Sequence, residues 1–545
     1  MAQLRTYLLA SVLWGVCGVV FAEPPAITGL YPAGVQQGER ATVSLIGKPG
    51  TEPLETWCSR DDVVLSPTNK PAEWVLTTAK NAPPGLCWVR FFNAEGASSL
   101  RSIVVGQLPE STEAEPNDDW TAPHDVPSLP IVVNGQLIKS GDVDTYAVNL
   151  EAGQTLVASV DAHRTLASPM DPVMQLLSPR GFVIEQNDDH HGNDPRIVFT
   201  APQAGTYFVR MFAFPADPNS SISFSGAETY VYRLTLTTGP FVNHVAPLAL
   251  GDASRLTMPV ARGWNLPDDP LRLSVDTNVP RSSPVFSVPT SLILDRLPRV
   301  SHPTLLESEL PTDTSPATLT MPVSVTSSIS QPEETDVFTF TGTKGQSLAI
   351  TADAHSFDSP LDPLLKVFGP EDKLLKEADD ESRDDNDSHL TVTLPADGTY
   401  RIELTDRFGH GDEWSVYLLT LQEDVPRYEL TLAADSLVLE AGKPEKDPFT
   451  IPVTITRSGG FNKEITLRLH GLPDGVSVSE MVSHPSGDSS KSVNLTLEAA
   501  GDVRFSGPLR VLGTIDSGET VVAQSPAPVE GLHIDSIWLT IVPGK

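Results

Sequence analysis

The sequence has few basic residues, few cysteines and few long apolar runs. Its 37 lysines and arginines stand against 70 aspartates and glutamates, which gives a formal net charge of −33 at pH 7. Nucleic acids and anionic membrane surfaces are therefore poor partners, because like charges repel, whereas divalent cations are attracted. Beyond residue 22, no apolar run approaches the roughly 20 residues that a membrane-spanning helix needs.

Motifs of common hydrolases are also missing. The sequence contains no His-Glu-x-x-His, no Gly-x-Ser-x-Gly and no Cys-x-x-Cys, which mark zinc peptidases, α/β-hydrolases and zinc ribbons. The many carboxylates leave a glycosidase-type pair open, but a sequence does not give the distance between two carboxyl groups. We therefore expect no catalysis by this chain.

The first residues have the pattern of a secretory signal. A basic start at Arg5, an apolar stretch from Tyr7 to Phe21 and a small residue at Ala22 are typical of a cleaved export peptide. Lipid attachment at Cys17 is the less favoured alternative, because Val16 precedes it where lipoprotein signals have Gly, Ala or Ser. We expect a secreted, periplasmic or cell-surface protein.

After removal of that segment two cysteines remain, Cys58 and Cys87. An even pair in an exported chain favours one disulfide, and the alternative is two buried free thiols.

A duplication is the strongest pattern in the sequence. The run from Asp142 to Tyr207 returns between Glu334 and Tyr400 with an offset near 192. The shared residues are turn formers, carboxylates and alternating apolar positions, which build β-sandwiches and cation sites and indicate a modular architecture. Short alternating runs, such as 155–160 and 347–352, indicate strands with one buried face. The fold class expected is all-β, in several domains.

An acidic segment precedes the first copy. Glu113, Glu115, Asn117 and Asp118 lie just before an expected strand, and Asp142 and Asp144 lie in a turn about 25 residues later. Calcium takes six to eight hard oxygen ligands, which clustered carboxylates and an amide carbonyl supply. From the residues alone, a solvated linker is the alternative.

Together these motifs resemble the bacterial pre-peptidase C-terminal domain, similar to the collagen-binding domain of clostridial collagenases. The resemblance rests on Glu-x-Glu-Pro-Asn-Asp at 113–118, Gly-Asp-Val-Asp-Thr-Tyr at 141–146, Gly-Thr-Tyr at 205–207 and 232–236. It implies a jelly-roll-like sandwich and a calcium site. Its ligands by position are Glu113, Glu115, Asn117, Asp118, Asp142 and Asp144. The two turn aspartates are closer in sequence here than in the collagenase members.

The second copy has a weaker version of this site. Its candidate ligands are Glu307, Glu309, Asp313, Glu334 and Asp336. Thr312 replaces the asparagine and Glu334 replaces an aspartate, so we expect weaker calcium binding or none.

Two further acidic or histidine-containing stretches are alternatives. The run 379–387, with 187–189 in the first copy, could hold another cation, but a solvated hairpin loop is favoured. His190 and His191 lie beside two aspartates, as a transition-metal site requires, yet neighbouring residues of a strand point to opposite faces. We expect an exposed loop there, and we expect His163 and His355 to pack near strand ends.

The expected organisation follows from the duplication and the seams rich in proline or acid. It comprises a signal peptide (1–22), an immunoglobulin-like domain (23–108), a first pre-peptidase-type sandwich (109–239), an immunoglobulin-like domain (240–305), a second pre-peptidase-type sandwich (306–423) and a C-terminal immunoglobulin-like domain (424–545).

The expected function is calcium-dependent binding, adhesion or scaffolding outside the cell, toward an extracellular protein or polysaccharide. The alternative is an accessory or targeting subunit of a separately encoded secreted peptidase or other hydrolase.

Overall fold

The computed structural model describes most of the chain after the expected signal segment. The described residues are 23–190, 192–217, 223–251, 259–271, 297–310, 316–380, 386–442, 449–528 and 532–543. The signal segment, His191 and Asp313 lie outside these ranges. Nearly every element within them is a strand, which confirms the all-β prediction. No helix in these ranges is long and apolar enough to cross a membrane.

The first domain, residues 23–108, is a sandwich of two sheets. Alternate residues of its long strand β7 point inward, so Cys87, Val89 and Phe91 are fully buried while the residues between them face the other way. One sheet has the order β1 (Ala26–Tyr31), β3 (Arg40–Lys48), β6 (Glu73–Thr78), β5 (Val63–Pro67); the other has β2 (Gly34–Gln36), β9 (Arg101–Gly106), β7 (Gly85–Asn93), β4 (Glu55–Cys58), with β8 (Gly96–Ala97) beside β7.

The first repeat domain, 109–239, has two five-stranded sheets. Inward-facing residues of both sheets, including Tyr146, Met174 and Tyr232, pack together to form its core. The first sheet is β10 (Glu110–Thr112), β12 (Ile131–Gln136), β19 (Val231–Thr237), β14 (Thr155–Asp161), β17 (Arg196–Thr200); the second is β11 (His124–Asp125), β13 (Asp144–Leu150), β18 (Gly205–Pro215), β15 (Met170–Leu177), β16 (Val183–Asn187). A one-turn helix, α1 (His163–Leu166), follows β14.

The second repeat domain, predicted at 306–423, begins with β22 at Thr304 and has the same two strand orders, as the sequence duplication predicts. Its sheets are β22 (Thr304–Leu306), β24 (Val323–Ser328), β31 (Val416–Glu423), β26 (Ser347–Asp353), β29 (Ser388–Thr393), and β23 (Ala317–Leu319), β25 (Thr335–Gly342), β30 (Gly398–Asp406), β27 (Pro363–Phe368), β28 (Leu374–Ala378). The 3-10 turns η2 (Glu307–Glu309) and η3 (His355–Phe357) complete it.

The segment between the repeat domains is described only in part. Within its described residues, β20 (Phe241–Ala246) and β21 (Val260–Trp264) form a two-stranded antiparallel sheet, and Leu250 makes a bridge to Arg299. Residues 252–258 and 272–296 of the predicted immunoglobulin-like domain lie outside the described ranges. A complete sandwich at 240–305 therefore stays a prediction.

The last domain, 424–545, is a further sandwich. A four-stranded sheet packs on a six-stranded one around Tyr428, Leu467 and Leu539. The strands are β32 (Arg427–Leu432), β34 (Phe449–Ser458), β38 (Ser492–Ala499), β36 (Val476–Val478), and β33 (Ser436–Glu440), β43 (Ile537–Val542), β39 (Phe505–Thr514), β35 (Ile465–His470), β37 (Met481–Ser483) with β40 (Thr520–Val522); β41 (Ser525–Pro526) pairs with β42 (His533–Ile534), and η4 (Asp488–Ser490) is a 3-10 turn.

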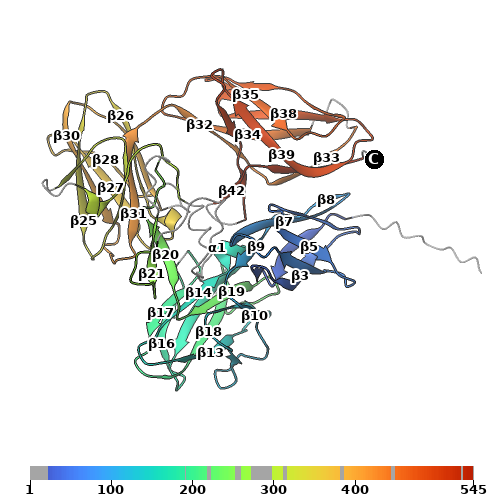
Figure 1. Cartoon of the computed structure of the whole chain (residues 1–545). Coiled ribbons are helices and arrows are strands. Elements are labelled where there is room, and N and C mark those ends of the chain that lie inside the picture. The colour runs from blue at the N-terminus through green and yellow to red at the C-terminus, as the bar shows by residue number, and fades with distance from the viewer. Residues whose placement is uncertain are drawn as a thin grey trace, which may run out of the picture.

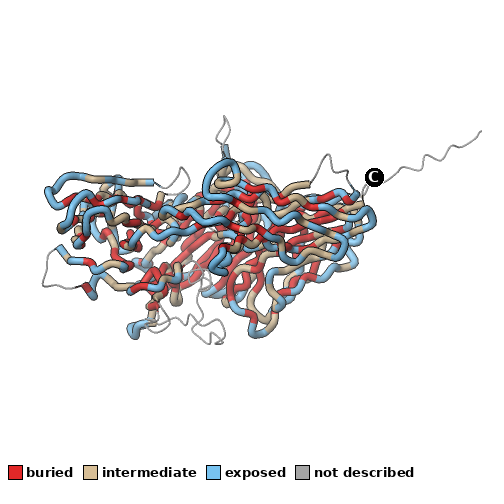
Figure 2. Tube along the Cα trace, turned by 90° about the horizontal axis from the view of Figure 1, so that it is seen from above, coloured by how far each residue is buried: buried red, intermediate tan, exposed pale blue. Residues whose placement is uncertain are grey.

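The chain folds back so that its last domain lies beside its first (Figure 1). Arg90 of β7 makes an ion pair of 2.7 Å with Asp435 of the last domain, and Trp57 packs edge-on against Trp538 at 5.8 Å between ring centroids. The two repeat domains also touch, through an ion pair between Arg164 and Asp358. Figure 2 shows buried segments gathered in the interior and exposed segments on the outside.

Candidate metal site and its surroundings

The acidic segment, residues 113–118, is held between the two sheets of the first repeat domain. After β10, the Glu113 amide donates to the Asn134 carbonyl of β12 at 2.9 Å. Four residues later, the Thr145 amide of β13 donates to the Asn117 carbonyl at 3.1 Å. The turn at 138–143 leads into β13 and presents Asp142 and Asp144 beside this segment. Backbone pairing therefore brings the linker and the distant turn together.

Three of the six predicted ligands form a carboxylate cluster. Oxygen atoms of Glu115, Asp142 and Asp144 all lie within 4.8 Å of one another. Glu115 is exposed, whereas Asp142 and Asp144 are completely buried. Like charges at this separation repel strongly once water is excluded. The close spacing of the two turn aspartates does not keep Asp142 out of the cluster.

Several polar atoms beside the cluster have no partner within the described residues. Both side-chain atoms of Asn117, which is 1% exposed, make no hydrogen bond, and Asp144 Oδ1 makes none. The other Asp144 oxygen accepts from Tyr232, and Asp142 accepts the Ile138 amide at 2.6 Å and pairs with Lys139 at 3.2 Å. Buried polar groups are normally satisfied. Unsatisfied hard oxygens beside three carboxylates fit a bound divalent cation.

Glu113 is half-buried and is held by two tyrosine hydroxyls. Its carboxylate accepts the Gln136 amide at 2.7 Å and the Tyr146 and Tyr232 hydroxyls at 3.1 and 3.3 Å. Burial raises the pKa of Glu113 to about 7, and burial together with the Glu113 charge raises the pKa of Asp144 well above its ordinary value. Glu113 is therefore outside the three-membered cluster but linked to Asp144 through Tyr232.

Asp118 is the most loosely held of the six. It accepts the Val143 amide at 3.4 Å and lies 3.8 Å from the Lys139 ammonium, with both side chains exposed. No role at the site was predicted for Lys139, for the motif residues Tyr146 and Tyr232, or for Tyr31 of the first domain. Burial, then the charge of Glu113, raises the pKa of Tyr31. The sequence did contain a signal for two of them, because Tyr146 follows Asp144 by two positions and Tyr232 begins the 232–236 motif.

The corresponding region of the second repeat domain is arranged differently. Asp336 accepts from Tyr417, as Asp144 does from Tyr232, and burial raises the pKa of Asp336 to about 6. Ser327 stands opposite Tyr417 in the register where Gly135 stands opposite Tyr232. Its hydroxyl bonds both Glu307 and Asp336.

Two further predicted ligands of the second copy, Glu309 and Glu334, accept backbone amides, and Asp313 lies outside the described ranges. Glu334 accepts the Ser330 and Gln331 amides at 2.6 and 3.0 Å, and Glu309 accepts the Leu306 amide at 2.9 Å. Among the described residues, no three carboxylates of this domain converge as in the first. The described residues of the two copies are therefore arranged differently, while calcium binding by either copy, and any difference in affinity, stays a prediction.

A buried aspartate in each copy has a structural role that the sequence did not reveal. Asp194 accepts the Ala162, His163 and Arg164 amides at the start of α1, and Asp387 accepts the Ala354, His355 and Ser356 amides in the same way. Each carboxylate satisfies otherwise unpaired N–H groups of the turn. Asp387, the last member of the acidic run 379–387, is therefore buried and not solvated, whereas residues 381–385 of that run lie outside the described ranges.

His190 also differs from its predicted exposed position. It is half-buried, and its Nε2 lies 3.3 Å from Arg196 Nη1. Burial lowers the pKa of His190 to about 3. The neighbouring Asp188 and Asp189 are exposed. His163, as predicted, is half-buried after its strand, with Nδ1 at 3.0 Å from the Ser168 carbonyl.

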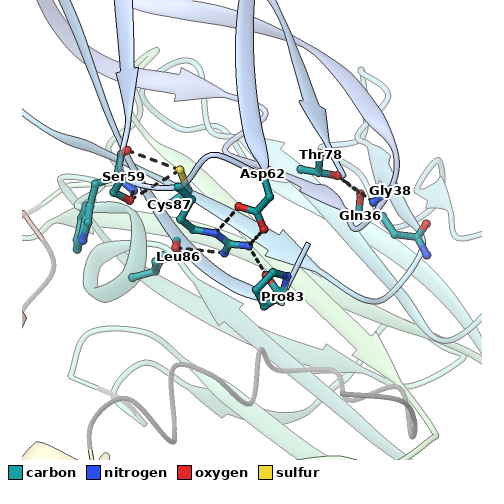
Figure 3. Close-up of polar contacts among 10 residues, drawn as sticks. Gln36, Gly38, Ser59, Asp62, Thr78, Pro83, Leu86 and Cys87 are labelled. Atoms are coloured by element: carbon teal, nitrogen blue, oxygen red, sulfur yellow. Dashed lines mark hydrogen bonds and ion pairs between the residues drawn. The ribbon is translucent and has the colours of Figure 1, made fainter. Parts of the chain in front are cut away.

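The two cysteines lie on neighbouring strands of the first domain. Cys58 ends β4 opposite Val89, and Cys87 is two residues earlier on β7. Both are free thiols here, so the predicted disulfide is not present in the structure. The hydrogen bond with Cys87, and then burial, raise the pKa of Cys58. Figure 3 shows Ser59 beside Cys87, with Asp62, Pro83 and Leu86 grouped nearby.

Oxidation of this pair is a testable expectation for the exported protein. Closing a loop of roughly 30 residues stabilises a domain by about 3 to 4 kcal/mol in the chain-entropy model. Peptide mass spectrometry of protein recovered from an oxidising compartment should detect the Cys58–Cys87 linked peptide, which reductant removes. Two alkylatable thiols in that material would contradict the prediction.

Comparison with known proteins identifies the repeated segments. The profile of the bacterial pre-peptidase C-terminal domain matches residues 142–213 and 334–406. A probable subtilase-type serine protease of Deinococcus radiodurans is 33% identical over 73 residues, which are 13% of this chain and 10% of the protease. The chain thus matches about a tenth of that relative's length.

Solved structures give partial likenesses. The pre-peptidase C-terminal domain of a collagenase from Bacillus anthracis is 14% identical and covers 19% of this chain and 92% of its own, with a TM-score of 0.16. The immunoglobulin domains 1–4 of Sidekick-1 are 12% identical and cover 94% of this chain and 98% of their own, with a TM-score of 0.20.

Proposed function

Because two segments of this chain are bacterial pre-peptidase C-terminal domains, we propose that the protein is an exported, non-catalytic binding protein whose first repeat domain is held together by calcium. The observation that carries this proposal is the carboxylate cluster of Glu115, Asp142 and Asp144 beside the unpartnered amide of Asn117. A calcium ion supplies the positive charge and the flexible oxygen coordination that this set of donors suits.

The residues themselves explain what such an ion would join. Glu115 and Asn117 belong to the linker that enters the domain, Asp142 belongs to the turn before β13, and Asp144 is the first residue of β13. Tyr232 holds one oxygen of Asp144, and the Ile138 amide holds one oxygen of Asp142. Each aspartate is therefore oriented before any ion binds, which reduces the ordering that binding requires.

The partner follows from charge and architecture. A chain of net charge −33 repels anionic surfaces, and β-sandwich domains in series present long surfaces to extracellular proteins or polysaccharides. We propose such a partner, bound outside the cell. The match to a segment of a subtilase-type protease supports the second candidate, an accessory subunit of a separate hydrolase. Recovery of one peptidase with the tagged protein from its own culture medium would favour that candidate.

Calcium titration of the full chain should detect one site and not two. The substitution Asp144→Asn should abolish calcium binding at this site, because the substitution removes one negative charge from the cluster. The matched variant Asp336→Asn should leave the binding isotherm unchanged, because Ser327 and Tyr417 already satisfy Asp336. Isothermal titration calorimetry with the chelated and dialysed protein provides the stoichiometry. Two equal sites, or no heat of binding, would contradict the assignment.

A further inference from the structure

The outward face of one sheet in the first domain carries a row of large side chains. Residues Trp88, Arg90 and Phe92 alternate along β7 with the buried Cys87, Val89 and Phe91. Trp57 stands directly opposite Arg90 on the neighbouring strand β4. Because alternate residues of a strand share a face, Trp57, Trp88, Arg90 and Phe92 form one surface, turned toward the last domain.

The last domain covers only part of this surface. Trp538 of β43 packs on Trp57 and Phe92, at 5.8 and 5.0 Å between ring centroids, and Asp435 pairs with Arg90. Beyond these contacts the two domains diverge around a cleft of about 560 Å³. Trp57, Trp88 and Ser59 line it from the first domain, and His470, Arg510 and His533 line it from the last.

The cleft combines indole rings with hydrogen-bonding groups. Trp57 and Trp88 are half-buried, whereas the imidazoles of His470 and His533 are exposed. Ligand sites are often found between domains, have volumes of about 300 to 1,000 Å³ and place a few polar groups among aromatic side chains. Both the size and the composition of this cleft agree with that description.

Charge selects among the ligands that could enter. The lining cation, Arg510, is paired with Asp535 at 2.9 Å, so the cleft carries little net charge of its own. The acidic chain around it disfavours anions such as phosphates and uronates. A neutral ligand with many hydroxyl groups and flat C–H faces suits both the low charge of the cleft and its lining. Its hydroxyls can bond the imidazoles, and its apolar faces can cover the indoles.

We propose that this cleft between the first and last domains binds a neutral saccharide chain, with Trp57 and Trp88 contacting sugar faces. The inference rests on the proposed function of extracellular binding and specifies one class of partner. The site is separate from the carboxylate cluster, so saccharide binding does not depend on calcium.

The test uses calorimetric titration of the full chain with cellohexaose, maltohexaose and chitohexaose, in EDTA and in calcium. At least one should bind equally under both conditions. Trp88→Ala should weaken that binding about tenfold or more, because it removes a contact face. Trp120→Ala is the matched control: that half-buried indole packs on Phe208 in the first repeat domain, and its loss should not change saccharide affinity.

A second variant provides an independent test in case Trp88→Ala impairs folding. His470→Ala removes an exposed side chain at the cleft and should weaken the same saccharide several-fold, with an unchanged melting profile. No binding by any of the three saccharides, or undiminished binding by both variants, would overturn the inference. Calcium-induced stabilisation measured on the same preparation tests the proposed function separately, so the two can fail independently.

Discussion

Replacing Asp144 by asparagine should abolish the rise in melting temperature that calcium produces in the wild-type chain. A ligand that binds only the folded state adds about 2.7 kcal/mol at a hundredfold excess over its dissociation constant. Asparagine keeps the oxygen that accepts from Tyr232 but removes the charge that a cation requires. The metal-free melting temperature should stay the same or rise, because repulsion within the cluster of Glu115, Asp142 and Asp144 falls.

The matched control for this experiment lies in the second repeat domain. Asp336→Asn makes the same chemical change opposite the corresponding tyrosine, Tyr417, and should retain the full calcium response. Differential scanning calorimetry of the full chain, with and without calcium, measures both variants. If the double variant Glu115→Gln/Asp144→Asn keeps the wild-type rise, the ligand assignment is wrong and the acidic segment is a solvated linker.

The same carboxyl groups set a pH dependence of opposite sign with and without metal. Burial raises the pKa of Glu113 to about 7 and that of Asp144 above its ordinary value. Without metal, these groups stabilise the fold fully below their unfolded pKa of about 4. This stabilisation is lost as the pH rises through their pKa in the folded protein. Calcium requires the deprotonated groups. Its stabilising effect should therefore be larger at pH 7.5 than at pH 5.5.

Local patterns in the sequence were sufficient to predict the strands and the duplication. The alternating run 155–160 lies within β14 (Thr155–Asp161), and 347–352 lies within β26 (Ser347–Asp353). Strand alternation and turn residues act over a few positions, so they can be seen without an alignment. The offset near 192 then predicted two domains of one topology, and both domains have the same strand orders.

Long-range contacts explain most of what the sequence did not reveal. Tyr232 reaches Asp144 from 88 residues away, and Glu113 from 119 residues away. The strand register that joins them depends on how the sheets close, which no local pattern specifies. The cap formed by Asp194 was hidden for a different reason: its carboxylate lies in an acidic stretch whose composition is typical of a solvated loop.

The contact between the first and last domains spans the greatest sequence separation among the contacts that were not predicted. Its ion pair joins Arg90 and Asp435, which are 345 positions apart, and the sequences of the two domains gave no sign that they pair. Strand β7 has a buried face and an outward face, and an outward Trp, Arg and Phe are compatible with either solvent or a partner domain. The structure shows that the partner is the other end of the same chain (Figure 1).

Removing the Asp435 carboxylate should destabilise this contact strongly. Arg90 is 1% exposed, and its guanidinium donates to Asp435 at 2.7 Å and to the Ser98 carbonyl at 2.6 Å. Asp435→Ala leaves a buried charge without its counter-ion, which costs about 3 to 5 kcal/mol. Arg90→Met should cost less, because Asp435 is partly exposed and still accepts the Leu100 amide.

A double-mutant cycle distinguishes a lost attraction from an uncompensated charge. In Arg90→Met/Asp435→Ala no buried charge remains, so the double variant should be more stable than Asp435→Ala alone. Urea unfolding followed by tryptophan fluorescence reports on the interface, because Trp57 and Trp538 pack there. The control is Arg468→Ala, which breaks an exposed ion pair of 2.8 Å with Glu480 and should cost at most about 1 kcal/mol. If Asp435→Ala costs no more than this control, the buried pair does not hold the terminal domains together, and the contact depends on the packing of Trp538 on Trp57 and Phe92.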